Sequence, residues 1–356
     1  MVAALNTLTR VGVGISPWLV IAGLLYVGLF VKPEPVGSTV IPTAIEARDR
    51  FYGLATPESN ILWAVAADGK IVRSDDAGKS WQVQDSGTNV HLQDIAAWDS
   101  NKAVIVGNSG VAMYTENGGQ SWWQADAPRN DVVNKLLDVK TYANGEAWAV
   151  GSFGTILVSR DYGKTWQYAL EPDDYILNEI TKRADGSLLT VGEFGTILLS
   201  TDGGQNWQNI RSGIESSLMT VDFADNQNGI AAGLDGVLLQ TRDGGQTWQR
   251  IRNQFKGLTE AKAAPGIANS GGWQDVTTEH IFTLRWHPQK SRWYGAGSKG
   301  LWLEADAEGN QWQSGRLAPK DLSWHTATVL TDEGVIYVGR NIGRWDGTNW
   351  QVYTSR

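Results

Sequence analysis

Short runs of apolar residues, each bounded by turn residues, recur along residues 51–356. One unit shows the pattern most clearly, and its four runs are Leu137–Tyr142, Glu146–Val150, Thr155–Ser159 and Trp166–Ala169. The length of these runs, the alternation in Ala147–Val150 and the turn-rich borders are typical of strands rather than helices. Each unit is therefore predicted to form four strands.

A tryptophan ends each unit, and the seven tryptophans are spaced by 41, 44, 41, 41, 64 and 38 residues. They are Trp81, Trp122, Trp166, Trp207, Trp248, Trp312 and Trp350. A G-x-x-G pattern precedes the third run of most units, and we expect its backbone to need positive φ. A period near 41 residues with several short strands is typical of a propeller blade. The sequence predicts an all-β fold, a seven-bladed β-propeller over residues 51–356, with residues 38–50 either an edge strand or a linker.

The segment before each tryptophan carries a second motif, the Asp-box S/T-x-D-x-G-x-S/T-W. Residues 74–81, 159–166 and 241–248 match it, and residues 200–207 depart only at Asn206. The aspartates of these four copies are Asp76, Asp161, Asp202 and Asp243. We expect each carboxylate to accept backbone N–H bonds within its own turn, and each tryptophan to pack between neighbouring blades. These residues are therefore interpreted as scaffold and not as a catalytic or calcium site.

The N-terminus is organised differently from the repeats. A short tail, residues 1–10, precedes 21 uncharged residues, 11–31, which as a helix are long enough to cross a bilayer. Residues 32–50 contain Pro33, Pro35 and Pro42 and are interpreted as an extended linker. The apolar run is too long for a usual signal peptide and lacks a nearby cleavage site, which favours an uncleaved signal-anchor. The sequence predicts a single-pass protein of the inner, cytoplasmic membrane with its propeller on the periplasmic side.

Composition excludes several kinds of site. The net charge of -8 argues against nucleic-acid binding, and the lack of cysteine removes disulfides and thiolate chemistry. The four histidines, His91, His280, His287 and His325, have no metal-like spacing. The G-x-x-G turns lack the following helix that holds a phosphate. We therefore predict no catalytic residues, no cofactor and no metal site.

At this point the chain resembles a known family. The run from Gly192 to Trp207, G-x-x-G-x-I-L-x-S-x-D-G-G-x-x-W, is similar to the repeats of the photosystem II assembly and stability factors, which are grouped with the BNR-repeat propellers. The resemblance implies a propeller that binds membrane-protein subunits and helps to assemble them, through a basic patch of arginines. Here the sequence offers only a small basic cluster, Arg250, Arg252 and Lys256.

The place where the period breaks is the first candidate for function. The 64-residue spacing after Trp248 indicates an insertion at about residues 252–279, between two blades. A long connection in a compact repeat is usually functional or disordered. Aromatic side chains at turn tips on the same face suit a protein interface, although the insertion folding back over them is an equal alternative. The candidate partner-binding residues are Phe153, Phe194, Phe255, Trp273 and Arg340.

The leading hypothesis is an accessory, assembly or stability subunit of an integral-membrane complex, with a transporter of the resistance–nodulation–division type as one partner class. The alternative is a glycosidase-like or carbohydrate-binding propeller with a central pocket. Asp94, Asp138, Glu179 and Asp222 lie in or just before first strands, and of these Asp138 and Asp222 could line such a pocket. Sialidases share the Asp-box, but their arginine-bearing F/Y-R-I-P motif is missing here.

Overall fold

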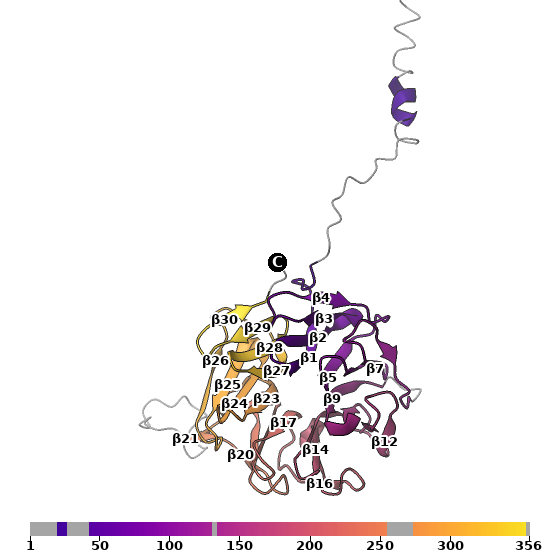
Figure 1. The fold of residues 1–356 in the computed structure, drawn as a ribbon. Coiled ribbons are helices and arrows are strands. Elements are labelled where there is room, and N and C mark those ends of the chain that lie inside the picture. The colour runs from indigo at the N-terminus through magenta and orange to yellow at the C-terminus, as the bar shows by residue number, and fades with distance from the viewer. Residues whose placement is uncertain (1–19, 27–42, 130–133, 255–272, 354–356) are drawn as a thin grey trace, which may run out of the picture. The chain divides into compact units, whose positions relative to one another are not determined.

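Seven four-stranded antiparallel sheets are arranged around a common centre in the computed structural model (Figure 1). The structure describes residues 20–26, 43–129, 134–254 and 273–353. In every sheet the strands are ordered as they occur in the chain, with the first strand innermost (Figure 1). The predicted seven-bladed, all-β propeller is confirmed.

The blades follow one another along the chain, each formed from one continuous segment. The first three are β1 (Phe51–Glu58), β2 (Ile61–Ala66), β3 (Ile71–Ser74) and β4 (Gln82–Gln84); β5 (Leu92–Ala97), β6 (Ala103–Gly107), β7 (Ala112–Thr115) and β8 (Trp123–Gln124); and β9 (Leu136–Thr141), β10 (Ala147–Gly151), β11 (Ile156–Ser159) and β12 (Gln167–Leu170). The next two are β13 (Leu177–Lys182), β14 (Leu188–Gly192), β15 (Ile197–Ser200) and β16 (Gln208–Asn209); and β17 (Leu218–Phe223), β18 (Gly229–Gly233), β19 (Leu238–Thr241) and β20 (Gln249–Arg250). The last two are β23 (Ile281–His287), β24 (Arg292–Gly297), β25 (Leu301–Ala305) and β26 (Trp312–Arg316); and β27 (His325–Thr331), β28 (Gly334–Gly339), β29 (Ile342–Trp345) and β30 (Trp350–Val352).

Between the fifth and sixth blades, β21 (Asn253–Gln254) pairs with β22 (Trp273–Gln274). This small antiparallel pair brings together the two ends of the insertion noted in the sequence. The segment between its strands, which includes Phe255 and Lys256, lies outside the described residues.

Apolar side chains form seven buried clusters, one for each junction between neighbouring blades. The repeat tryptophan of each blade lies in the cluster shared with the preceding blade. Trp166 of the third blade, for example, packs with Val104 and Ala112 of the second. Burying such a large ring removes much apolar surface from water, which is why one tryptophan per unit stabilises each junction.

In the described residues, the ring closes by packing between its first and last blades, without a shared sheet. Ala44, Trp81 and Val338 belong to one buried cluster, and Tyr353 lies against Trp81 with ring centroids 6.2 Å apart. Thr326 Oγ1 donates a hydrogen bond to the carbonyl oxygen of Tyr52 at 3.1 Å. Of the two alternatives for residues 38–50, the described part, 43–50, forms no strand and contributes Ala44 to the closure.

The G-x-x-G turns correct one expectation from the sequence. Only the second glycine has positive φ, such as 68° at Gly195, whereas the first, Gly192, is extended. A Cβ on Gly192 would lie 2.1 Å from the carbonyl oxygen of Ile176, so close approach, not φ, requires glycine there. The residue before the second glycine, Phe194, is also left-handed, at φ 54°.

The N-terminal segment is a separate unit from the propeller. Of the span predicted at 11–31, the structure describes residues 20–26, which are helical and exposed. Within the described part of the chain, no helix is both long enough and apolar enough to cross a membrane. The rest of the predicted span lies outside the described residues.

Candidate functional site

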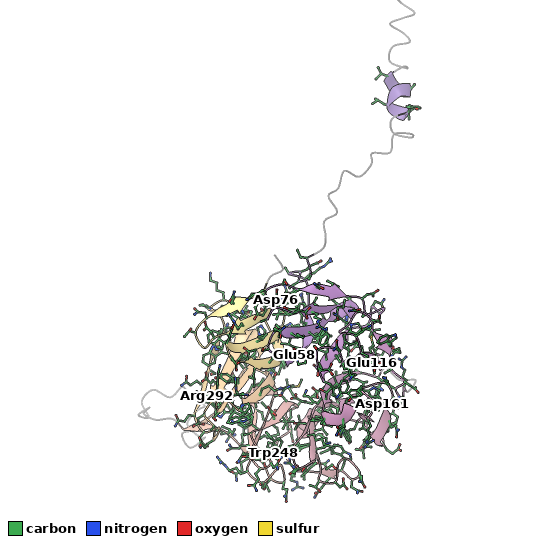
Figure 2. All side chains as sticks on the ribbon, in the orientation of Figure 1. Glu58, Asp76, Glu116, Asp161, Trp248 and Arg292 are labelled. Atoms are coloured by element: carbon green, nitrogen blue, oxygen red, sulfur yellow. The ribbon has the colours of Figure 1, made fainter. Side chains whose placement is uncertain are left out.

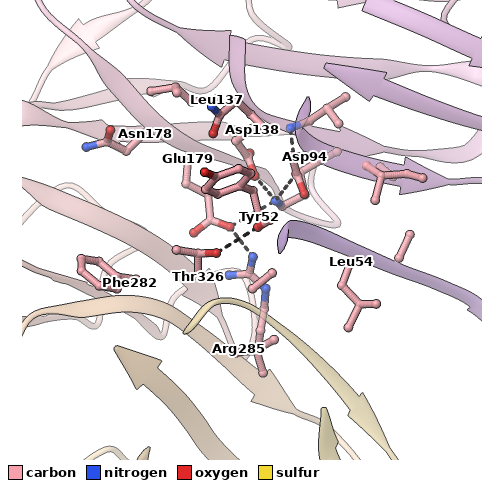
Figure 3. A pocket seen from close by; sticks show the side chains of 18 of the residues that line it. Tyr52, Leu54, Asp94, Leu137, Asp138, Asn178, Glu179, Phe282, Arg285 and Thr326 are labelled. Carbon is pink, nitrogen blue, oxygen red and sulfur yellow. Dashed lines mark hydrogen bonds and ion pairs between the residues drawn. The ribbon is translucent and has the colours of Figure 1, made fainter. Parts of the chain in front are cut away.

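A cavity of about 370 Å³ lies at the centre of the ring, and the innermost strands of all seven blades line it (Figure 3). One residue near the start of each of these strands belongs to its wall. These residues are Tyr52, Gln93, Leu137, Asn178, Met219, Phe282 and Thr326. Inner strands begin where the interblade connections end, so this part of the cavity lies toward the face that carries those connections. The cavity wall there is a mixture of aromatic, aliphatic and amide groups.

Charged side chains converge in this cavity. Lys140 Nζ of β9 lies 3.1 Å from Glu179 Oε1 and 3.9 Å from Asp94 Oδ2, and it also contacts Asp138. Arg285 of β23 forms an ion pair with the same Glu179 oxygen. Figure 3 shows Asp94, Asp138, Glu179 and Arg285 reaching toward one another from four different blades. We refer to these four residues and Lys140 as the central charge cluster.

Four carboxylates of the inner strands also bond to the next blade. Asp94 accepts the backbone N–H of Val139 at 3.1 Å, and Asp138 accepts that of Ile180 at 3.0 Å. Glu179 repeats the contact one blade further on, with the N–H of Val221 at 2.9 Å. Asp222, which the sequence also placed near the channel, accepts the N–H of Trp286 at 2.8 Å. These carboxylates therefore satisfy backbone groups at blade junctions, a role that holds neighbouring inner strands in register.

Burial and charge set different protonation states within the central charge cluster. Burial raises the pKa of Asp94 to about 8, because Lys140 compensates only in part for the lost hydration. Burial also raises the pKa of Asp138. It acts on Glu179 in the same direction, but Arg285 and Lys140 outweigh it and lower the pKa of Glu179 to about 2. At neutral pH, Glu179 is thus the ionised partner of both cations, while Asp94 is largely protonated.

Lys140 and Arg285 are the functional-site residues that the sequence analysis missed. Each is a charged residue three positions after the cavity-wall residue near the start of its strand, Leu137 for Lys140 and Phe282 for Arg285. The charged residue at this position was the signal in the sequence that could have identified them. No group of three or more His, Cys, Asp or Glu side chains in the described residues is arranged to hold a metal ion.

The Asp-box aspartates lie toward the outside of the ring, as Asp76 and Asp161 show in Figure 2. Asp161 Oδ1 accepts the backbone N–H of Thr165 at 3.0 Å and the hydroxyl of Ser159 at 2.9 Å. Its Oδ2 accepts the Thr165 hydroxyl at 2.6 Å. The same set of bonds recurs at Asp76 and Asp243, and at Asp202 the amide of Asn206 replaces the second hydroxyl as donor. These hydrogen bonds all lie within one turn.

The predicted partner-binding residues are distributed over the face that carries the G-x-x-G turns. Phe194 is 75% exposed, Phe153 is half-buried, and both have positive φ, at 54° and 56°. Arg340 is exposed at the corresponding turn of the last blade, and Trp273 is in β22. Phe255 lies outside the described residues. The structure thus brings Phe153 and Phe194 to turns of adjacent blades and keeps Arg340 three blades away from Phe194.

The small basic cluster does not provide a free arginine patch. Arg250 Nη2 lies 3.0 Å from Asp275 Oδ2, and Arg252 Nε lies 3.5 Å from Asp275 Oδ1. One carboxylate therefore pairs with both side chains and offsets one of their two positive charges. The third member, Lys256, lies outside the described residues.

Comparison with known proteins agrees with the propeller fold described above. A family model described as Photosynthesis system II assembly factor YCF48 matches residues 81–173 and 174–264, just over half of the chain. No curated protein sequence matches the chain.

Solved structures similar to this chain include other propellers. A structure titled "YCF48 bound to D1 peptide" has a TM-score of 0.65 and 17% identity, covering 88% of this chain and 95% of that one. YCF48 from Cyanidioschyzon merolae has a TM-score of 0.62 and 14% identity, with 84% and 94% covered. The WD40 repeats of RRP9 reach 0.63 at 10% identity, with 87% and 94% covered. At such identities these likenesses show the fold alone.

Proposed function

Because the chain belongs to the photosynthesis system II assembly factor YCF48 family, we propose that it is a non-enzymatic accessory or assembly factor for an integral-membrane protein complex. The family resemblance derived from the repeat around Gly192–Trp207 is confirmed by the family model. The observation that carries the proposal is the exposed ring of Phe194. It occupies the tip of a turn where folding does not need an aromatic side chain, and exposed aromatic rings are favoured at protein interfaces.

Two observations support the kind of partner that we propose: the family of the chain and the solved complex of YCF48 with a peptide. One member of the family binds a D1 peptide, which supports a segment of a membrane protein as the partner here. A transporter of the resistance–nodulation–division type is one candidate class. We propose that the partner rests on the face with the G-x-x-G turns, because Phe194, the β21–β22 pair and the start of the inner strands share that face.

We propose further that residues 11–31 anchor the chain in the inner membrane, with the propeller on the periplasmic side. This span of 21 residues has no charged side chain. Its described part, residues 20–26, is helical and exposes Val20, Leu24 and Leu25. An anchor would raise the local concentration of the propeller beside its partner.

The alternative of a glycosidase-like enzyme depends on the carboxyl groups of the cavity. A glycosidase needs two carboxyl groups that face a sugar and are free to exchange protons. Here Lys140 lies among Asp94, Asp138 and Glu179, and each of these carboxylates accepts a backbone N–H from the next blade. The arrangement favours a structural role for these groups over acid–base catalysis.

Purification of the tagged full-length chain in several mild detergents tests the proposal. We expect a multi-span membrane protein to co-purify in stoichiometric amount and to be identified by mass spectrometry. A matched chain lacking residues 1–42 should retain the interaction more weakly if the anchor only concentrates the propeller. Recovery of the free monomer alone in every detergent would contradict the proposed function.

A further inference from the structure

Five neighbouring segments form one continuous surface over the third, fourth and fifth blades. They are residues 152–154, 171–176, 193–195, 211–217 and 234–236, which we call the blade 3–5 surface. Backbone hydrogen bonds join three of the four adjacent pairs: Asp173 N–H to Phe153 O at 3.0 Å, Glu193 N–H to Ile176 O at 3.0 Å, and Leu234 N–H to Ser217 O at 2.9 Å. The fourth pair, residues 193–195 and 211–217, is in close contact, since a Cβ on Gly195 would lie 2.4 Å from Ile214 O. The surface therefore has a fixed backbone on which side chains are displayed.

Apolar groups lie exposed near the middle of this surface. Phe194 is 75% exposed and Ile176 is 36% exposed, and Phe153 and Tyr175 are half-buried beside them. Ile176 and Phe194 are held close because the backbone N–H of Ile176 also bonds to Glu193 Oε1 at 3.0 Å. The left-handed backbone at Phe194 is unfavourable for a bulky residue, so its ring is displayed despite a local conformational cost.

The charge around these apolar groups is strongly one-sided. The blade 3–5 surface contains one basic residue, Arg211, and six acidic ones: Glu171, Asp173, Asp174, Glu193, Glu215 and Asp235. Within the described parts of the chain, none of the six forms an ion pair with a lysine or arginine. Five of the six are exposed, and Glu193 is half-buried. A surface that combines exposed apolar side chains with carboxylates that lack a lysine or arginine partner is complementary to a cationic, apolar partner.

We propose that the blade 3–5 surface binds a partner segment in which an apolar side chain is flanked by lysines or arginines. The inference rests on the proposed function, because it specifies the chemistry of the partner segment. A second copy of this chain is a poor occupant, since two such surfaces would place like charges against each other. The central cavity is not needed for this contact.

Two double variants distinguish binding at this surface from attraction to the net negative charge of the protein. Glu171→Lys with Asp174→Lys reverses two exposed charges on the surface, and neither side chain forms a hydrogen bond or ion pair in the described residues. Glu58→Lys with Asp332→Lys makes the same charge change at the β1–β2 and β27–β28 turns, on the opposite face. Glu58, at the end of an inner strand, is labelled in Figure 2. A third variant, Phe194→Ser, removes the apolar contact without changing charge.

The probe is a short fluorescent peptide of alternating Leu and Lys, with Lys→Glu and Leu→Ser versions as controls, titrated into the full-length protein. Of the three peptides, we expect only the Leu/Lys version to bind. Its affinity should fall on the order of tenfold for the surface double variant and for Phe194→Ser. The opposite-face double variant should bind as the native chain does, and added salt should weaken binding. Equal weakening by both double variants would overturn the proposal, because it would mean attraction to net charge alone.

Co-purification with the surface double variant shows whether this inference or the proposed function fails. Loss of the membrane partner with the surface variant, but not with the opposite-face variant, supports both. If the partner co-purifies equally with both variants, the proposed function stands and the assignment of the surface is wrong. If no partner is recovered with the native chain while the peptide still discriminates the variants, the surface assignment stands and the proposed function fails.

Discussion

Glu179 accepts the backbone N–H of Val221 in the next blade at 2.9 Å, while its other oxygen pairs with Lys140 at 3.1 Å. One carboxylate thus joins the third, fourth and fifth blades at the centre of the ring. Its side chain is only 5% exposed, so the charges around it are poorly screened by solvent.

Replacing Glu179 by Gln tests this junction. The amide oxygen of Gln can still accept the Val221 N–H, but Lys140 and Arg285 lose their ionised partner. Breaking a buried ion pair costs about 3 kcal/mol or more, so the urea midpoint should fall markedly. Glu58→Gln, at an exposed turn, is the control and should leave the midpoint nearly unchanged. Equal midpoints for both variants would mean that the central charge cluster adds nothing to stability.

The pKa of Asp94 predicts a dependence of stability on pH. Burial raises it from 3.8 to about 8, so the folded protein holds a proton that the unfolded chain releases. The contribution of this proton is complete below about pH 4 and is lost as pH rises to about 8. Asp94→Asn keeps an acceptor for the Val139 N–H and removes the titration. Melting temperatures of the two proteins across this range should diverge in favour of the variant as pH rises; parallel curves would contradict the shift.

The second blade shows what happens when asparagine replaces the aspartate of an Asp-box, and this allows a prediction for Asp161 in the third blade. Asn117 occupies the aspartate position in the second blade, where its Oδ1 accepts the Ser121 N–H at 3.0 Å. Asp161→Asn should therefore cost well under 1 kcal/mol, whereas Asp161→Ala, which loses every acceptor, should cost about 1–2 kcal/mol. Chemical denaturation of both variants measures the difference. A similar loss in both would show that charge, and not hydrogen bonding, stabilises the turn.

Gly53 allows the first and second blades to approach each other. A Cβ at this position would lie 2.6 Å from both Cα and Oδ1 of Asp94. We expect Gly53→Ala to lower stability by about 2 kcal/mol, because backbone at a packed junction cannot move aside easily. Thermal unfolding checks the loss. An unchanged melting temperature would show that the junction can open without cost.

A substitution of Phe194 is expected to change stability and partner binding in opposite directions. At φ 54° a glycine is more favourable than phenylalanine, and the ring, 75% exposed, contributes little packing. Phe194→Gly should therefore raise stability by up to about 1 kcal/mol, as measured by chemical denaturation, while weakening co-purification of the partner. Phe153→Ala, at a half-buried ring, should lower stability modestly. Loss of folding with Phe194→Gly would mean that the ring is part of the core.

The sequence predicted the features that repeat and act locally. The seven tryptophans and the four Asp-box turns are visible because each motif forms its hydrogen bonds within a few residues, as between Asp161 and Thr165. The central charge cluster was only partly visible. Glu179 and Arg285 are 106 residues apart, and their contact depends on the closed ring rather than on a local pattern.

The surface around Phe194 was also only partly predicted. The exposed ring followed from its position at a turn tip, as expected for the candidate partner-binding residues. The acidic surroundings did not, because the carboxylates come from two interblade connections and two turns that are separated in the sequence. The basic cluster of Arg250 and Arg252 gave a misleading local signal, since Asp275, beyond the insertion, pairs with both.

The way in which the ring closes has a consequence for the history of the protein. Each blade is encoded by one uninterrupted stretch of about 40 residues, and no sheet in the described part of the chain contains a strand from the other end. A gene duplication or deletion of one such stretch would add or remove a complete sheet without leaving a strand unpaired. The side-chain junction between Trp81 and Tyr353 would only need to adapt to a wider or narrower circle. Propellers built in this way can therefore change blade number by recombination, one whole module at a time.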